Sequence, residues 1–282
     1  MDRDIIAKLI ESALEEDLGD GDHTSLSTIP ATAEGKAKLL IKDTGVIAGI
    51  ELALEIFKKV DADLKVELLI HDGKEVKPGD IAFFVTGNVR SILLAERLVL
   101  NTMQRMSGIA TTTYNIVKQL KGTGTKVLDT RKTTPNLRCL EKWAVKIGGG
   151  VNHRFGLYDM ILIKDNHVDY AGGIKNAITS AKEYLKKNNK QLQIEIEVRN
   201  LNELSEVLAT EGVDRVLLDN FNFDDLKKAV ELVDKRILTE ASGGITPQNA
   251  LDYAKCGVDY ISMGALTHSV NSLDMSLKAV IA

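Results

Sequence analysis

Basic side chains gather in one segment of a chain whose formal net charge is −4. Several of them directly follow short apolar runs, such as KVLD and MILI. A cation at the end of a strand points into the mouth of an α/β fold, whereas a solvated helix spreads its charges at helical spacing. We therefore expect a ligand with several carboxylates or phosphates. The cations of this segment are Arg131, Lys132, Arg138, Lys142, Lys146, His153, Arg154 and Lys164.

The composition narrows the class of protein. The length of 282 residues suits one large or two modest domains. The acidic balance argues against nucleic acid or an anionic membrane as a partner. The sequence contains no long apolar run, so we expect neither a signal peptide nor a membrane span. Cys139 and Cys256 are isolated in the sequence, which favours a reducing cytoplasm and disfavours a structural zinc site.

The first third of the chain mixes helical and strand patterns, which predicts an α/β sandwich domain over residues 1–113. We expect a helix over 2–18, two strands around a turn within 35–49, and a helix over 49–60. Strands are expected over 64–70 and 80–89. A long helix over 91–120, interrupted near Gly108, follows them. We expect the C-terminal tail, 271–282, to join this domain.

The pattern then changes to short apolar runs that alternate with helical segments. This alternation predicts a parallel sheet. About seven strands favour an incomplete α/β barrel over residues 114–270, with an open doubly wound sheet as the alternative. In such barrels the active residues lie at the carboxyl ends of the strands. The runs are KVLDT, GGVNH, MILIKD, IEIEV, RVLLDN, ILTEAS and YISMG.

Two of these strand ends predict a phosphate site. Ser242, Gly243 and Gly244 allow the backbone to approach an anion, Thr246 is placed to cap a helix that opens at Pro247, and Gly264 follows the next strand. A tight turn before a helix is the structural alternative.

Acids end the two preceding strands. Glu197 and Asp219 could bind sugar hydroxyls, hold a magnesium ion bridged by pyrophosphate, or stabilise positive charge. Glu195 lies on the same side of its strand as Glu197. The alternative to a catalytic role is a buried ion pair with Lys132 or Lys164.

A set of seven motifs, DTRKTTP, GGGVNHR, LIKDNH, IEIEV, LLDN, EASGGI and ISMG, resembles quinolinate phosphoribosyltransferase, also called decarboxylating nicotinate-nucleotide pyrophosphorylase. The likeness extends upstream through ERLVLNTMQRMSGIAT and EDLGDGDHTS. It implies an N-terminal α/β sandwich, an incomplete seven-stranded α/β barrel, and a homodimer or hexamer in which subunits share active sites. It also implies a pentosyltransferase that converts quinolinate and phosphoribosyl pyrophosphate, with Mg²⁺, into nicotinate mononucleotide, pyrophosphate and CO₂.

The resemblance also assigns residues, although Asp165, Asn166, His167 and His23 receive no role. Arg105 is expected to reach into the neighbouring subunit's site. The catalytic set is Glu197, Asp219, Lys132 and Lys164. The phosphoribosyl and phosphate set is Glu197, Asp219, Ser242, Gly243, Gly244 and Gly264. The quinolinate set is Arg105, Thr130, Arg131, Lys132, His153, Arg154 and Lys164.

Three alternatives stay open at this point. A Schiff-base aldolase would use Lys164 as its amine. A non-catalytic sensor of a phosphorylated metabolite would need the glycine-rich strand ends but not the cations. A paralogous phosphoribosyltransferase would act on another base.

Overall fold

The computed structural model describes residues 3–280 and divides them into two compact units. The first contains the described residues up to Tyr114, the segment Thr133–Gly149 and the described residues from Leu266. The second contains Asn115–Lys132 and Gly150–Ala265. Residues 133–149 thus lie in the first unit, although the sequence boundary at 113 places them in the barrel. Arg105, which binds Glu141 through its guanidinium, is one of the contacts that hold them there.

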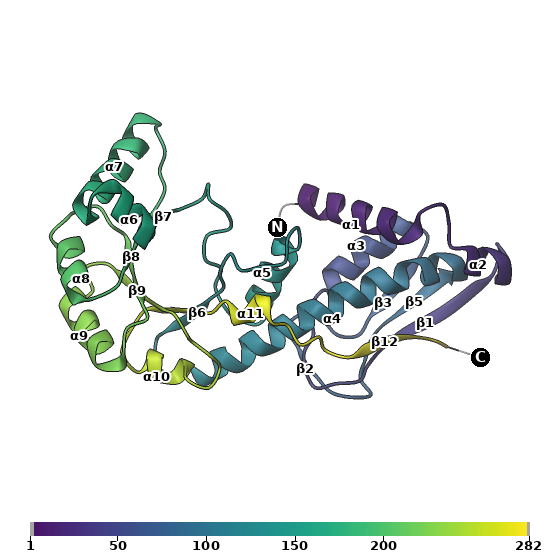
Figure 1. Cartoon of the computed structure of the whole chain (residues 1–282). Helices are drawn as coiled ribbons and strands as arrows, with labels where there is room; N and C mark the ends of the chain where they lie inside the picture. Colours follow the sequence, from purple (N-terminus) through teal and green to yellow (C-terminus); the bar gives the residue numbers. More distant parts are fainter. Residues whose placement is uncertain (1–2, 281–282) are drawn as a thin grey trace. The chain divides into compact units, whose positions relative to one another are not determined.

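The first unit is built on a four-stranded antiparallel sheet with the order β12-β1-β5-β3 (Figure 1). Its central pair, β1 (Glu34–Ile41) and β5 (Ile81–Asn88), is flanked by β3 (Lys65–Leu68) and β12 (Met275–Ala279). Alternate residues of β1 are buried, as expected of a strand with one face against a core. The C-terminal strand therefore completes the sheet of the first unit.

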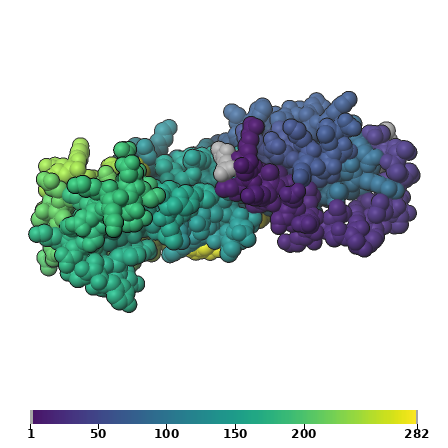
Figure 2. Space-filling view, turned by 90° about the horizontal axis from the view of Figure 1, so that it is seen from above, coloured from purple at the N-terminus to yellow at the C-terminus, as the bar shows by residue number. Residues whose placement is uncertain are grey.

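Three helices lie close to the positions expected from the sequence: α1 (Arg3–Leu18), α3 (Ile50–Val60) and α4 (Val89–Gln119), whose last residues, 115–119, belong to the second unit. The first unit also contains α2 (His23–Thr28) and α5 (Arg138–Ile147), which the sequence did not predict. In the space-filling view the purple N-terminal helix lies against the blue surface that follows it in sequence (Figure 2), and a cleft of about 650 Å³ is lined by both α1 and α3.

The expected interruption of the long helix at Gly108 is wrong. Helix α4 runs through this residue without a break. A Cβ at Gly108 would collide with the backbone of Asn271 and Ser272, so the glycine permits close packing of the C-terminal segment rather than a kink.

The two strands expected around a turn within residues 35–49 are present as β1 and the short β2 (Gly45–Val46), but they do not pair with each other. Strand β2 pairs with β4 (Glu75–Val76) instead. The N–H of Val46 donates to Thr111 Oγ1 of α4 at 2.8 Å, and a side chain at Gly45 would collide with the same threonine. The segment that contains β2 therefore packs against α4 instead of pairing with β1.

The second unit is a parallel sheet with the order β6-β11-β10-β9-β8-β7. Val151 forms an isolated parallel bridge to Leu128, beside β6. Six paired strands and this bridge make the incomplete, about seven-stranded barrel that the sequence predicts. The strands are β6 (Lys126–Leu128), β7 (Ile161–Ile163), β8 (Ile194–Val198), β9 (Arg215–Asp219), β10 (Leu238–Ser242) and β11 (Tyr260–Ser262).

Helices follow the strands of this unit, and α7, α8 and α9 lie outside β8 and β9 (Figure 1). Asn200 and Asn222 cap α8 and α9 by accepting hydrogen bonds from backbone N–H groups of the first turn. These helices are α6 (Asp165–Ala171), α7 (Ile174–Lys187), α8 (Leu201–Leu208), α9 (Phe223–Val233), α10 (Ala250–Ala254) and α11 (Ala265–His268), the last of which crosses the division between the units.

The expected start of a helix at Pro247 is wrong, because α10 begins at Ala250. Asn249 Oδ1 accepts from the N–H of Thr246 at 2.7 Å, and its amide donates to the carbonyl of Gly244 at 3.1 Å. These bonds hold residues 244–249 in a turn.

Between residues 3 and 280, no helix has the length and apolar character needed to span a membrane.

Candidate active site

The polar residues predicted from the sequence lie at or just after the carboxyl ends of the barrel strands. Most belong to the second unit, and Arg105 alone among the predicted site residues belongs to the first. Those of the second unit are Thr130, Arg131, Lys132, His153, Arg154, Lys164, Glu197, Asp219, Ser242, Gly243, Gly244 and Gly264.

Asp129 anchors two of these segments to each other. It is fully buried at the end of β6. Its carboxylate accepts from the backbone N–H of His153 at 2.9 Å and from the side-chain amide of Asn152 at 2.5 Å. The following residues, Arg131 and Lys132, are exposed. One buried acid thus fixes the loop that carries His153 beside the loop that carries these two cations.

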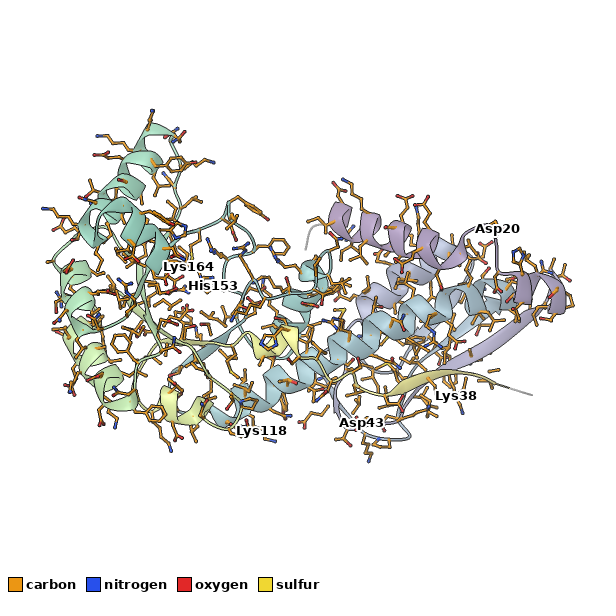
Figure 3. The ribbon with its side chains drawn as sticks, viewed as in Figure 1. Asp20, Lys38, Asp43, Lys118, His153 and Lys164 are labelled. Atoms are coloured by element: carbon orange, nitrogen blue, oxygen red, sulfur yellow. The ribbon has the colours of Figure 1, made fainter. Side chains whose placement is uncertain are left out.

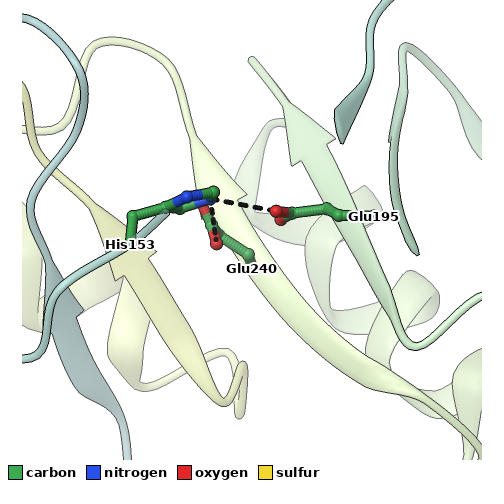
Figure 4. A group of neighbouring side chains, drawn as sticks. All are labelled: His153, Glu195 and Glu240. Carbon is green, nitrogen blue, oxygen red and sulfur yellow. Dashed lines mark ion pairs between the residues drawn. The ribbon is translucent and has the colours of Figure 1, made fainter. Parts of the chain in front are cut away.

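His153 lies between two buried glutamates from neighbouring parts of the sheet (Figure 4). Its Nε2 is 2.9 Å from Glu195 Oε2 and 3.5 Å from Glu240 Oε2. Arg215 Nη1 donates to Glu240 Oε2 at 3.0 Å. Both glutamates have fully buried side chains, so two carboxylates and one guanidinium share a layer that water does not reach.

This group holds protons tightly. Burial lowers the pKa of His153, but hydrogen bonding and charge from Glu195 and Glu240 outweigh it and raise the pKa to about 9. Burial, followed by the charge of Glu240, raises the pKa of Glu195 to about 7, against the opposing effect of His153. At neutral pH the His153–Glu195 pair therefore retains a proton that balances the two carboxylates against Arg215.

The tautomer of His153 follows from its other nitrogen. The backbone N–H of Arg154 donates to Nδ1 at 2.7 Å, so Nδ1 acts as an acceptor and the ring proton lies on Nε2, facing the glutamates. A second ring proton would displace the Arg154 N–H. The contact at Nδ1 therefore favours Glu195 as the holder of the additional proton, and the raised pKa values describe the His153–Glu195 pair rather than a doubly protonated ring.

Arg154 and Lys164 bring positive charge to this side of the sheet (Figure 3 labels His153 and Lys164). Burial, and then the charge of Arg131, lower the pKa of Arg154, so Arg154 and Arg131 lie close enough to repel each other. Lys164 Nζ is 3.8 Å from Glu197 Oε2. Cations that repel one another in the unliganded protein favour binding of a multiply charged anion.

Glu197 and Asp219 form an acidic pair beside Lys164. Burial raises the pKa of Glu197, Lys164 opposes this, and the charges of Asp219 and Asp165 raise the pKa further. Asp219 Oδ2 accepts from the amide of Asn220 at 2.7 Å. Both acids are partly exposed, so their oxygens can meet hydroxyl groups or a hard cation.

The glycines after β10 have distinct structural reasons. Gly243 has φ +94° and a Cβ there would collide with Asn220, so the loops after β9 and β10 approach closely. Gly244 has φ +61° and faces open space. Ser242 and Gly264 are partly exposed at the ends of neighbouring strands. The geometry suits close approach of a phosphate to the backbone.

Arg105 is held within the first unit. Glu141 Oε1 accepts from its Nε at 2.9 Å and from its Nη2 at 2.6 Å, and Thr134 Oγ1 accepts from Nη2 at 2.7 Å. Glu141 also accepts from the N–H of Thr134 at 3.2 Å. This buried acid fixes the guanidinium and the loop after Lys132 together.

Three charged residues of these clusters received no role from the sequence: Glu141 and Arg215 were not singled out, and Glu240 was noted only as part of a polar strand end. Glu141 and Arg215 fall within patterns that resemble an ordinary helix and an ordinary strand. Glu240 could have been assigned a role, because it precedes SGG and places a carboxylate inside a strand with Thr239 and Ala241, both buried. The alternation of Glu195 and Glu197 did indicate that both lie on the same side of their strand.

The residues without an assigned role are structural in part. His167 Nδ1 accepts from the N–H of Lys164 at 3.0 Å, and Asp165 and Asn166 form the first turn of α6. His23 begins α2, next to its N-cap Asp22, and is exposed.

The fold and these strand ends together define an incomplete α/β-barrel protein that carries cations, acids and a glycine turn at the carboxyl ends of its strands. The family model for the N-terminal domain of quinolinate phosphoribosyl transferase matches residues 22–107, and the model for its C-terminal domain matches residues 109–278. The chain belongs to the quinolinate phosphoribosyltransferase family.

Individual relatives agree with this assignment. A mitochondrial quinolinate phosphoribosyltransferase [decarboxylating] 2b of Nicotiana tabacum is 46% identical, over 97% of this chain and 82% of its own. A probable nicotinate-nucleotide pyrophosphorylase [carboxylating] of Methanocaldococcus jannaschii is 43% identical, over 99% and 98%. The structure of NadC from Streptococcus pyogenes has a TM-score of 0.94 at 36% identity, over 100% of this chain and 99% of that one.

Proposed function

We propose that this protein transfers the phosphoribosyl group of phosphoribosyl pyrophosphate to quinolinate and decarboxylates the product, as a step of NAD biosynthesis. The products are nicotinate mononucleotide, pyrophosphate and CO₂. The observation that carries the proposal is the joint presence, at one end of one parallel sheet, of a cation group, an acidic pair and a glycine turn. Each matches one part of the two substrates.

The cations suit the two adjacent carboxylates of quinolinate. Arg131 and Arg154 offer planar forks, and Lys132 and Lys164 offer compact charges. Because burial and then the charge of Arg131 lower the pKa of Arg154, a dianion bound between the two guanidinium groups relieves repulsion. A monocarboxylate would relieve less of it.

The acids suit the transferred ribose. The pyridine nitrogen forms a bond to the anomeric carbon, and the bond to pyrophosphate breaks with its electron pair. Positive charge develops on the ribose, and Glu197 and Asp219 are placed to hold its hydroxyls and stabilise that charge. Ser242, Gly243, Gly244 and Gly264 would receive the 5′-phosphate.

Decarboxylation then requires no base from the protein. The C–C bond to the 2-carboxylate breaks, CO₂ leaves, and the electron pair stays on C2 beside the positively charged ring nitrogen. A proton from solvent completes the product. The protein's task is to orient the carboxylates, which the cation group does.

Magnesium enters as a partner of phosphoribosyl pyrophosphate. The carboxylate oxygens of Glu197 and Asp219 are the hard ligands that Mg²⁺ prefers, and the mutual repulsion of these acids supports a cation between them. The ion would neutralise charge on the leaving pyrophosphate. The same acids fit ribose hydroxyls, and both roles are compatible.

We also propose a homodimer or larger assembly in which Arg105 serves the neighbouring subunit's site, and a reducing cytoplasm as its location. The side chain of Arg105 is partly exposed, which leaves part of the guanidinium within reach of a second copy. Cys139 and Cys256 are isolated from each other in the sequence and form no closely spaced cysteine motif, which supports a reducing compartment. Some plant relatives are named mitochondrial or chloroplastic.

The aldolase alternative is weakened by the geometry around Lys164. A Schiff base needs an uncharged amine, whereas this amine forms an ion pair with Glu197 at 3.8 Å. Borohydride with a carbonyl substrate should leave no covalent adduct.

The test is release of pyrophosphate from phosphoribosyl pyrophosphate with quinolinate, nicotinate and nicotinamide in parallel. We expect turnover with quinolinate only, because the single carboxylate of nicotinate leaves cations unpaired, at a cost of typically about 1–3 kcal/mol for each lost charge-assisted contact. Equal turnover of quinolinate and nicotinate would overturn the proposal, and turnover of another base alone would identify a paralogue.

A further inference from the structure

Glu195 and Glu240 take no part in the proposed chemistry, although each is a fully buried acid beside the site. Three of their four carboxylate oxygens have no hydrogen bond of good geometry among residues 3–280. They are Oε1 and Oε2 of Glu195 and Oε1 of Glu240. Burying carboxylates with incomplete partners is costly. What these acids do contact is the Nε2 side of His153, within 2.9 and 3.5 Å.

The opposite side of the His153 ring contacts Arg154, one of the cations proposed to bind quinolinate. Nδ1 of His153 accepts the backbone N–H of Arg154 at 2.7 Å, while Asp129 holds the N–H of His153. The backbone of Arg154 is therefore fixed through the ring, and the ring is fixed by the two glutamates. If the ring rotated, the N–H of Arg154 would lose its acceptor.

A bound metal ion is the other explanation of this cluster, because ligand atoms of His153, Glu195 and Glu240 lie within 4.8 Å of one another. Arg215 argues against it. Its Nη1 already donates to Glu240 Oε2 at 3.0 Å, so a divalent cation would lie next to a guanidinium. Arg215 already supplies a positive charge to the carboxylates, and the ring faces them with the N–H of Nε2.

We propose that Glu195 and Glu240 are positioning residues that hold the His153 ring, and through it the backbone of Arg154, so that the guanidinium enters the mouth in the orientation that quinolinate requires. The inference rests on the proposed function for its ligand. It assigns these acids an effect on quinolinate affinity without contact with quinolinate.

The test uses direct binding of quinolinate, measured by calorimetry on the full chain. Glu195→Leu removes the carboxylate that lies 2.9 Å from Nε2 and leaves Arg215 balanced by Glu240 beside a singly protonated ring, so the layer stays neutral and the variant is expected to fold. We expect its dissociation constant to rise about tenfold, the effect of losing about 1.4 kcal/mol. Glu195→Gln retains a side-chain oxygen and should recover most of that affinity.

A matched control separates positioning from general loss of stability. Ile196→Val shortens a fully buried neighbour in the same strand, whose side chain faces away from the cluster by strand alternation. It should reduce the melting temperature without a change in quinolinate affinity. An equal loss of affinity in this control would overturn the inference.

A double-mutant cycle tests whether the effect passes through Arg154. Arg154→Lys keeps the charge, so binding stays measurable, but loses the fork. In that background Glu195→Leu should weaken binding less than about twofold, because coupled residues are not additive. Full additivity would overturn the inference, as would a stoichiometric metal in the purified protein by elemental analysis. Failure of the unmutated protein to bind quinolinate would instead count against the proposed function.

Discussion

Glu141 holds Arg105 side-on, with one carboxylate oxygen 2.9 Å from Nε and 2.6 Å from Nη2. The glutamate side chain is 1% exposed and the arginine side chain 30% exposed. The pair therefore combines a buried acid with a guanidinium whose remaining part can be reached. This arrangement gives Arg105 a structural role in addition to the one proposed in catalysis.

Replacing Arg105 alone should reduce both stability and activity. Arg105→Ala leaves Glu141 buried without its cation, and breaking a buried pair in this way typically costs about 3–5 kcal/mol. Arg105→Ala combined with Glu141→Gln should recover most of the stability, since no buried charge is left unpaired. Chemical denaturation and pyrophosphate release should be measured on both variants.

The stabilised double variant separates the two roles. If Arg105 binds quinolinate, the double variant should stay nearly inactive although it is folded. Recovery of activity together with stability would show that Arg105 serves only to neutralise Glu141.

Subunit mixing tests whether Arg105 acts on a neighbouring subunit. Arg105→Ala and Lys132→Ala proteins should each be nearly inactive. In a hybrid dimer one site keeps both native residues, so equal mixing with full exchange should restore about a quarter of native activity. Turnover is measured before and after exchange, whose extent native mass spectrometry follows. Complete exchange without restored turnover would show that Arg105 and Lys132 serve the same subunit's site.

The acids should affect turnover more than affinity. Glu197→Gln and Asp219→Asn keep size and hydrogen bonding but remove charge. If these acids stabilise an oxocarbenium-like ribose, the single-turnover rate should fall on the order of 10²-fold or more, because the interaction strengthens in the transition state.

Calorimetry with quinolinate supplies the comparison for these acid variants. Their affinity should change little, whereas Arg154→Ala and Lys164→Ala should weaken quinolinate binding directly. Acid variants that lose affinity while keeping normal single-turnover rates would place Glu197 and Asp219 in substrate positioning.

Much of the barrel could be predicted because its strands are short, apolar and followed by polar residues, as at β8 and β9. The sequence did not show that the two strands within 35–49 stay unpaired with each other, because Thr111, which accepts from the N–H of Val46, is distant in sequence. The interruption predicted at Gly108 is wrong because the glycine is there for another reason. The backbone of Asn271, also distant in sequence, leaves no room for a side chain at this position.

The candidate site followed the same division. The ends of the predicted strands indicated which cations and acids lie at one edge of the sheet, because that position depends only on where each residue stands relative to its own strand. Glu141, Arg215 and Glu240 depend on partners from other elements, so local patterns carried little information about them.

The proton that the His153–Glu195 pair retains should give the folded protein an unusual dependence on pH. Within this pair the pKa of His153 is raised from 6.5 to about 9, and that of Glu195 from 4.5 to about 7. The folded pair therefore binds a proton that the unfolded chain has released. Its contribution is fully present below the unfolded pKa values and is lost as the pH rises through 7 and 9.

We expect the melting temperature to fall between pH 6.5 and 9, and Glu195→Leu to flatten this fall because it removes one group and the main partner of the other. Glu240 has a lowered pKa, so its effect belongs to acidic pH and does not interfere. Calorimetric melts of the unmutated protein, Glu195→Leu and Ile196→Val supply the comparison, and the valine variant should keep the native slope. Parallel pH profiles for the unmutated protein and Glu195→Leu would show that the buried layer retains no additional proton.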